Sequence, residues 1–86
     1  MREKRPALVI TFPTTTDAMG MERLCRDSAL PGRLIPVPRE ISAGCGLAWK
    51  APTDAEELLK SAMAEAGLRW QESRVVELWE LSGQRS

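Results

Sequence analysis

The sequence contains no histidine and only two cysteines. Without histidine the chain lacks the usual general base at neutral pH, the commonest transition-metal ligand and any Ser-His or Cys-His catalytic pair. Two cysteines cannot by themselves build a four-thiolate zinc site. These absences exclude most familiar hydrolase chemistry, and we expect neither a metal centre nor a cofactor.

The chain also lacks an excess of either charge and any long apolar run. Lys and Arg together number 12, as do Asp and Glu, so no net positive charge attracts a phosphate backbone. No apolar segment approaches the length that spans a bilayer, and the basic residues 2–5 are not followed by a signal-peptide core and cleavage site. We therefore expect a cytoplasmic protein with reduced thiols, and no binding to nucleic acid or membranes.

The length and composition fit one small folded domain. Of the 86 residues, 43% are hydrophobic and 28% are charged, a balance typical of globular chains. We place the domain at residues 7–81, between a flexible N-terminus at 1–6 and a flexible C-terminal tail at 82–86. A domain of this size buries a modest share of its surface, so we expect limited stability.

Short runs of branched and aromatic residues predict four strands, over 7–12, 33–38, 46–51 and 74–81. Prolines at alternate positions, Pro36 and Pro38, remove backbone donors from one side of the second strand. This pattern indicates a strand at the edge of a sheet.

Two helices are predicted between these strands. Thr14 with Asp17 approximates a capping box and Thr53 with Glu56 forms a full one, so we expect the helices to begin there. Gly67 is placed to end the second helix. The apolar stripe predicted to face the core from that helix comprises Ala55, Leu58, Leu59, Ala62, Met63 and Ala66.

The element order is strand, helix, strand, strand, helix, strand. Right-handed crossovers in two such units give an α+β fold of the ferredoxin-like βαββαβ type, a four-stranded antiparallel sheet with two helices on one face. The second and fourth strands are then the edges, in agreement with Pro36 and Pro38. The other face of the sheet, where we place Trp49 and Trp79, would be costly to leave in water, so we predict a homodimer through it.

The segment between the second and third strands carries the most distinctive chemical group, the thiol of Cys45. Gly44 and Gly46 flank it, so the sulfur should be reachable and the backbone can adopt positive φ angles. The amides from Ser42 to Gly46 could then converge on the sulfur or on a bound anion. Such an environment favours a thiolate, and we infer that Cys45 is reactive.

Positive charge on either side of this loop would act in the same direction. Arg39 precedes the loop and Lys50 follows it, and both could favour the thiolate. The alternative is that Cys45 is a small apolar residue in a turn. For Cys25 we favour that second interpretation, because it lies on the apolar face of the first predicted helix.

Two segments give the chain its resemblance to a known family. They are residues 9–18, Val-Ile-Thr-Phe-Pro-Thr-Thr-Thr-Asp-Ala, and residues 33–47, Arg-Leu-Ile-Pro-Val-Pro-Arg-Glu-Ile-Ser followed by Ala-Gly-Cys-Gly-Leu. Over residues 7–81 the chain resembles the DUF3343 family, which is described as carrier-like for selenium or sulfur.

This resemblance implies that Cys45 accepts a sulfur or selenium atom as a persulfide or perselenide and passes it from a donor protein to an acceptor protein. Gly44 and Gly46 would shape the loop, Ser42 would donate a hydrogen bond, and Arg39 would stabilise anionic sulfur or contact a partner. Such a carrier requires no histidine, metal or cofactor. The resemblance thus favours a carrier that hands over a bound atom over a turnover enzyme.

Two other functions fit the same fold. A small-molecule-binding or protein-binding regulatory module would use the loop as a recognition surface. A metal chaperone would need a second thiol near Cys45, which Cys25 or a second subunit would have to supply. Replacing Cys45 by serine separates carrier from binding module, because binding can survive that change and chalcogen transfer cannot.

Overall fold

The structure of the chain is a computed structural model that describes residues 2–39, 41 and 45–81. Within these residues the elements follow the predicted order. They are β1 (Arg2–Thr11), α1 (Thr15–Asp27), β2 (Arg33–Pro36), β3 (Leu47–Ala51), a 3₁₀ turn η1 (Thr53–Ala55), α2 (Glu56–Ala66) and β4 (Glu72–Leu81).

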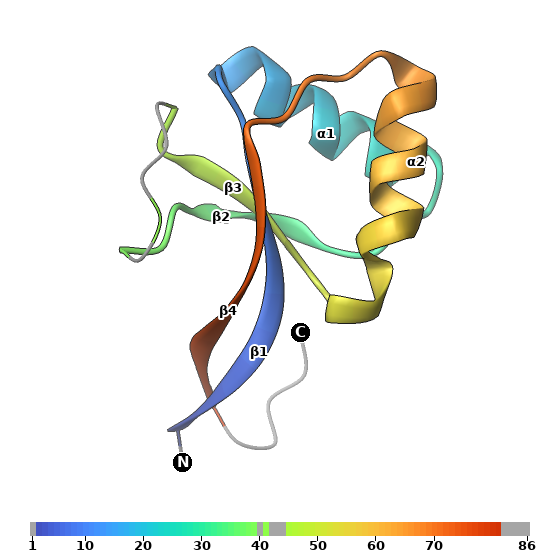
Figure 1. The fold of residues 1–86 in the computed structure, drawn as a ribbon. Helices are drawn as coiled ribbons and strands as arrows, with labels where there is room; N and C mark the ends of the chain where they lie inside the picture. Colours follow the sequence, from blue (N-terminus) through green and yellow to red (C-terminus); the bar gives the residue numbers. More distant parts are fainter. Residues whose placement is uncertain (1, 40, 42–44, 82–86) are drawn as a thin grey trace.

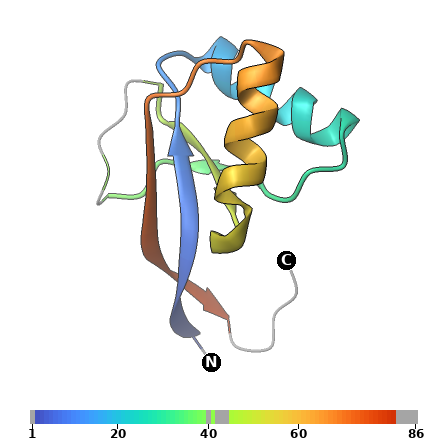
Figure 2. The ribbon, with the colours of Figure 1, turned by 45° about the vertical axis from the view of Figure 1, so that its right-hand side comes forward.

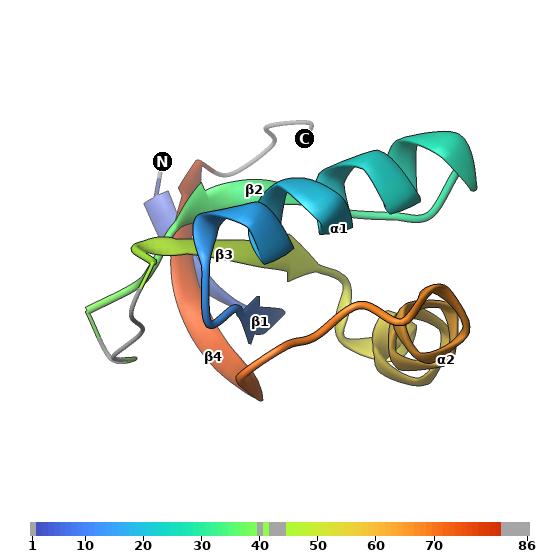
Figure 3. The same cartoon turned by 90° about the horizontal axis from the view of Figure 1, so that it is seen from above.

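The four described strands form one sheet in the order β2-β3-β1-β4, and every neighbouring pair is antiparallel. Both helices cover the same face of the sheet (Figure 1), and α1 packs over β3 and β2 (Figure 3). The predicted α+β fold of the ferredoxin-like type is therefore confirmed, with β2 and β4 at the edges. We call the face opposite the helices the open face.

Strand β1 is longer than its sequence pattern predicts. The prediction begins it at residue 7, but the ladder with β4 continues to the pair Arg2 and Leu81. Residues 2–6, expected to be flexible, thus form the outer half of a two-stranded ribbon that extends beyond the other strands (Figure 2). The segment is mostly charged and therefore has no strand-like sequence pattern. Its strand forms through pairing with residues 77–81, which lie at the far end of the sequence. The tail at 82–86 lies outside the described residues.

The main core lies between the sheet and the helices. Leu8 and Ile10 on β1 and Phe12 directly after it point toward the helices, where all three are fully buried. The helices contribute Ala18, Met21 and Cys25 from α1 and Leu59 and Met63 from α2. Each fully buried large apolar side chain stabilises the fold by roughly 1.5–3 kcal/mol relative to exposure, so this layer holds the helices against the sheet.

The open face carries a second, smaller apolar cluster. Val9, Ala48 and Val76 lie side by side on three neighbouring strands, and Ile41 from the β2–β3 loop packs onto them. Trp49 does not belong to this face, contrary to the prediction. It is buried on the helix side, because it shares the alternation of Leu47 and Ala51, and its indole N–H donates to the carbonyl of Pro31 at 3.0 Å.

These observations change the basis of the predicted homodimer. The side chain of Trp79 lies outside the described part of the chain, and Trp49 faces the other way. The dimer through the open face stays a prediction, and it now depends on the smaller cluster around Val9.

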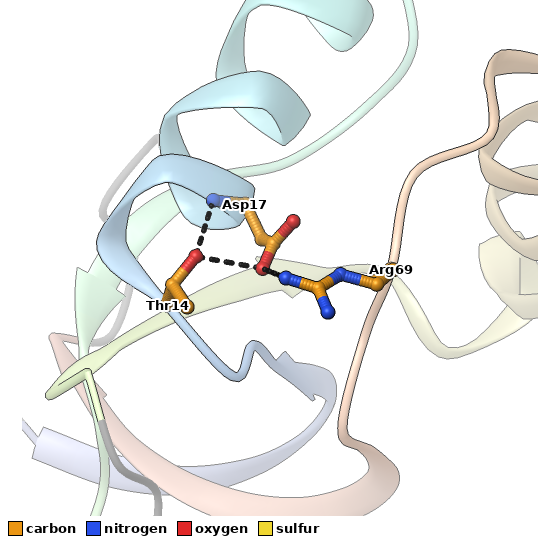
Figure 4. Close-up of polar contacts among 3 residues, drawn as sticks. All are labelled: Thr14, Asp17 and Arg69. Carbon is orange, nitrogen blue, oxygen red and sulfur yellow. Dashed lines mark hydrogen bonds and ion pairs between the residues drawn. The ribbon is translucent and has the colours of Figure 1, made fainter.

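The predicted cap of α1 is confirmed. The backbone N–H of Asp17 donates to Thr14 Oγ1 at 3.1 Å, and the Thr14 hydroxyl donates to Asp17 Oδ2 at 2.7 Å. The same carboxylate oxygen accepts a hydrogen bond from Arg69 Nη2 at 3.2 Å (Figure 4). Because Arg69 follows α2, this contact ties the two helices together at one end of the sheet.

The predicted capping box of α2 is wrong. Thr53 begins the 3₁₀ turn η1 and no side chain caps α2. The carboxylate of Glu56 instead contacts Lys60 Nζ at 2.8 Å and accepts a hydrogen bond from Ser73 Oγ at 2.9 Å. Its partners thus lie one turn further along the helix and on β4, not at Thr53.

The stripe predicted for α2 is correct in part. Ala55, Leu59 and Met63 are buried, but Leu58 is 53% exposed. The helix ends at Gly67 as predicted, with a left-handed φ of 68° and the amide of Leu68 donating to the carbonyl of Met63.

Candidate functional site

The candidate site lies at the base of the β2–β3 loop. Its two ends are joined by the last ladder pair, Pro36 with Leu47, and by a hydrogen bond from the amide of Val37 to the carbonyl of Gly46 at 3.1 Å. Inside the loop, the amide of Ile41 donates to the carbonyl of Pro38 at 3.0 Å. Since the Ile41 side chain is buried on the open face, the described parts of the loop are anchored to the sheet.

Cys45 stands at the point where this loop enters β3. Its side chain is partly buried and packs against the core on the helix side. The thiol donates to the carbonyl oxygen of Leu47, with 3.4 Å between Sγ and the oxygen. A carbonyl oxygen can only accept a hydrogen bond, so this contact belongs to the protonated thiol and breaks when the thiol ionises.

Gly46 has the conformation that the sequence predicts for it. Its φ is 77°, and a Cβ at this position would meet no atom within 4 Å. The glycine is therefore required for its backbone angle and not for space. It turns the chain into β3 immediately after the thiol and leaves the sulfur without a bulky neighbour on that side.

The second cysteine is placed differently. Cys25 is 3% exposed on the inner face of α1, as predicted, and neither of the two cysteines forms a disulfide. Burial raises the pKa of the Cys25 thiol from 9.0 to about 11, because the charged thiolate loses its hydration. Ionisation of the Cys25 thiol near neutral pH is therefore disfavoured.

The structure reaches only some of the other predicted site residues. Arg39 is exposed at the end of the first described part of the loop. Ser42 and Gly44 lie outside the described residues, as does most of the predicted cluster of amides. Of the predicted residues, the structure therefore brings together Cys45 and Gly46.

Lys50 does not lie beside the loop, contrary to the prediction. It sits near the opposite end of β3 on the open face, where it pairs with Val9 and Arg33. A strand rises about 3.3 Å per residue, so Lys50 lies roughly 16 Å from Cys45. Its charge is too distant to act on the thiol as a neighbour, because β3 runs straight away from the loop.

One feature near Cys45 is not apparent from the loop sequence alone. Thr11 pairs with Ala48, so β1 leaves the sheet where β3 enters it, and α1 begins at that same end (Figure 1). The first turn of a helix carries unpaired amides and a partial positive charge. The capping motif Thr-x-x-Asp at 14–17 predicts this helix start, but only the strand register brings it to the end of the sheet that holds Cys45.

The described residues include neither a metal-binding cluster nor a helix that could span a membrane. Among residues 2–39, 41 and 45–81, no three His, Cys, Asp or Glu side chains form a group that could hold a metal ion. In the same part of the chain, no helix has the length and apolar character needed to cross a membrane.

A family described as "Putative Se/S carrier protein-like" matches residues 7–73, a range that extends from β1 to the start of β4 and includes Cys45. No match was found among curated proteins or among solved structures. The match confirms the resemblance carried by residues 9–18 and 33–47, and the chain belongs to the Se/S carrier protein-like family.

Proposed function

We propose that this protein carries sulfur or selenium, holding the atom as a persulfide or perselenide on Cys45 and delivering it to an acceptor protein. The observation that carries the proposal is the contrast between the two thiols. Cys45 is partly exposed at the base of a loop, whereas Cys25 is buried with a pKa of about 11. Family membership supplies the class of cargo.

The transfer consists of two thiol-exchange steps. In the first, the Cys45 thiolate attacks the outer sulfur of a donor persulfide, the S–S bond of the donor breaks, and the donor leaves as a thiolate. In the second, a thiolate of the acceptor attacks the outer sulfur on Cys45, and Cys45 leaves as a thiolate. Sulfur changes hands without an external oxidant or reductant, so the carrier needs no redox cofactor.

The residues around the thiol would assist in different ways. The hydrogen bond from the thiol to the carbonyl of Leu47 is lost on ionisation, which frees the sulfur to turn outward. Gly46 and Gly44 would leave room for the added atom, and Ser42 would donate a hydrogen bond to it. Arg39 would stabilise the anionic outer sulfur or contact a partner, and the first turn of α1 would add backbone donors at the same end of the sheet.

The same proposal defines the setting of the protein. We place it in the cytoplasm, where thiols are kept reduced, and its partners are a donor and an acceptor of sulfur or selenium. It acts as a carrier that returns to its free thiol after each delivery and not as a turnover enzyme.

Intact-mass spectrometry tests the proposal directly. The wild type, Cys45→Ser and Cys25→Ala are each exposed to glutathione persulfide, and half of each sample is then treated with a thiol reductant. We expect one added sulfur atom on the wild type and on Cys25→Ala, none on Cys45→Ser, and loss of the adduct after reduction.

Two results would overturn the carrier function. An unmodified wild type would show that Cys45 does not accept sulfane sulfur, and equal adducts on Cys45→Ser would show that another group does. Either outcome would favour the alternative, a binding module that uses the loop as a recognition surface.

A further inference from the structure

A pocket of about 390 Å³ lies at a corner of the sheet, at the end of β3 that is remote from Cys45. It exists because the strands differ in length. β1 pairs with β3 only from Leu8 to Thr11, whereas its earlier residues, 2–7, pair with β4 alone. Three segments border the resulting corner: 6–7 on β1, 31–33 at the start of β2 and 50–52 at the end of β3. Its volume falls within the range of roughly 300–1,000 Å³ that small-molecule pockets occupy.

The charges at this corner have one sign. Arg33 and Lys50 both line the pocket, and no acidic side chain of the described residues does. The two are partners in the β2–β3 ladder, so their side chains emerge next to each other on the open face. An anion bound between them would be in reach of both cations.

Arg33 presents its charge more openly than Lys50. It is exposed and has no ion-pair partner within the described residues, whereas Lys50 makes a further contact inside the chain. A guanidinium group donates parallel hydrogen bonds that fit phosphate and carboxylate oxygens. Arg33 is therefore the main anion-binding group of the pocket, with Lys50 as a second cation.

The wall that carries Arg33 is held from behind. Gly32 has a φ of 119°, and a Cβ there would lie 2.6 Å from the carbonyl oxygen of Lys50 and against the indole nitrogen of Trp49. The same nitrogen donates to the carbonyl of Pro31 at 3.0 Å. With buried Trp49 behind it, the segment 31–33 is fixed before any ligand arrives, which reduces the entropy lost on binding.

The remaining walls are apolar and stiff. Pro6, Pro31 and Pro52 border the space together with Ala7 and Ala51, and proline rings have a fixed backbone φ. The pocket is larger than a bare inorganic anion requires, and these walls offer contact to an organic body. We propose that the pocket binds a small organic phosphate monoester, with the dianionic group between Arg33 and Lys50 and the organic part against the prolines.

The proposed site is independent of the thiol chemistry. Lys50 lies roughly 16 Å from Cys45 along β3, and no residue that borders the pocket belongs to the β2–β3 loop. The proposal thus goes beyond the carrier function, and neither depends on the other.

The test is a titration of the isotope-labelled full chain with phenyl phosphate, in which changes in the amide NMR chemical shifts report binding. We expect the shifts to concentrate in segments 6–7, 31–33 and 50–52. Arg33→Gln should weaken binding by about tenfold or more, since a hydrogen bond to a charged group contributes roughly 1.5–3 kcal/mol, and Lys50→Gln should weaken it in the same direction. The matched control is Arg23→Gln, which removes an equal charge from an exposed position on α1 and should leave the affinity within about twofold.

Two further ligands complete the design. Phenol should not bind measurably, because it lacks the dianion, and inorganic phosphate should bind more weakly than phenyl phosphate, because it lacks the organic body. The proposal is overturned if Arg23→Gln weakens binding as much as Arg33→Gln, if shifts spread over the whole chain, or if either of these two ligands binds as tightly as phenyl phosphate.

Discussion

Replacing Gly32 by alanine should be among the most damaging single substitutions outside the main core. The added Cβ would lie 2.6 Å from the backbone oxygen of Lys50 and would press on the Trp49 indole. The backbone oxygen belongs to β3, which is paired with β2 on one side and with β1 on the other, so it cannot move away without disturbing the sheet. The positive φ of 119° adds strain for any residue that has a Cβ.

The size of the effect follows from these contacts. Overpacking of this kind typically destabilises a protein by about 1–3 kcal/mol. If the indole is displaced, its N–H loses the carbonyl of Pro31, and a buried donor without a partner adds about 1–3 kcal/mol. We expect a loss of about 4 kcal/mol in the free energy of unfolding, at the upper end for single substitutions. A chain of this length has a total stability on the order of 4–13 kcal/mol, so the variant should be close to unfolding.

Gly67→Ala is the matched control. Gly67 also has a positive φ, 68°, but a Cβ there would meet nothing within 4 Å. This variant should lose only the cost of placing a residue with a Cβ in the left-handed conformation, about 1–2 kcal/mol of the free energy of unfolding. Urea unfolding followed by tryptophan fluorescence gives the free energy of unfolding for both variants and the wild type. Equal losses in the two alanine variants would refute the argument, because they would show that Trp49 and β3 accommodate the extra carbon freely.

Three further predictions concern the thiols, a carboxylate and α2. With Ellman's reagent at neutral pH, the folded protein should release one equivalent of thionitrobenzoate through reaction of Cys45, and a second equivalent, from Cys25, only after denaturation. Rapid release of two equivalents from the folded protein would contradict the burial of Cys25. The hydrogen bonds from Lys60 and Ser73 lower the pKa of Glu56, so its stabilising effect is present above the unfolded-state pKa and is lost as pH falls through the folded-state value. Thermal melts from about pH 5 to about pH 3 should therefore show a larger drop for the wild type than for Glu56→Gln, and parallel curves would argue against this role. Leu59→Ala should destabilise the protein by about 2–5 kcal/mol and Leu58→Ala by less than about 0.5 kcal/mol in chemical unfolding; a reversal of that order would mean that α2 presents a different face to the sheet.

The features that the sequence predicts correctly depend on neighbours within one turn of chain. Thr14 and Asp17 cap each other across three residues, and Gly67 ends α2 through its own backbone angle. The alternate prolines Pro36 and Pro38 place β2 at an edge because the missing donors are their own. Such signals need no knowledge of the tertiary structure.

The predictions that fail around α2 share a tertiary cause. Glu56 does not cap α2, and its carboxylate instead accepts a hydrogen bond from Ser73 on β4, a partner that only the tertiary structure supplies. A 3₁₀ turn, which winds more tightly than an α-helix, occupies residues 53–55, so α2 begins at Glu56 and not where the capping motif places its start. The sequence pattern allows both Leu58 and Leu59 to face the core. In the structure Leu59 is buried and Leu58 is exposed.

In the candidate site, too, the sequence predicts the local features, and those that depend on the tertiary structure escape it. The contrast between Cys45 beside glycine and Cys25 on an apolar helical face is visible in the sequence, and the structure confirms the burial of Cys25 and the partial exposure of Cys45. The corner pocket was missed because Arg33 and Lys50 meet only through the strand register. Lys50 is near the loop in sequence but not in space, because an extended strand carries it away from Cys45.

The long pairing of β1 with β4 determines how the domain responds to mechanical force. Arg2 lies opposite Leu81 at the outer end of this antiparallel ribbon. A pull applied between these two residues therefore loads the ladder one rung at a time from its open end, as in the opening of a zipper, instead of shearing all the rungs together. The ribbon should separate under small forces as far as the pair Leu8 and Val75, where β3 begins to support β1 from the other side. A single-molecule pulling experiment on the two ends would record this as a gradual extension before the abrupt release of the core.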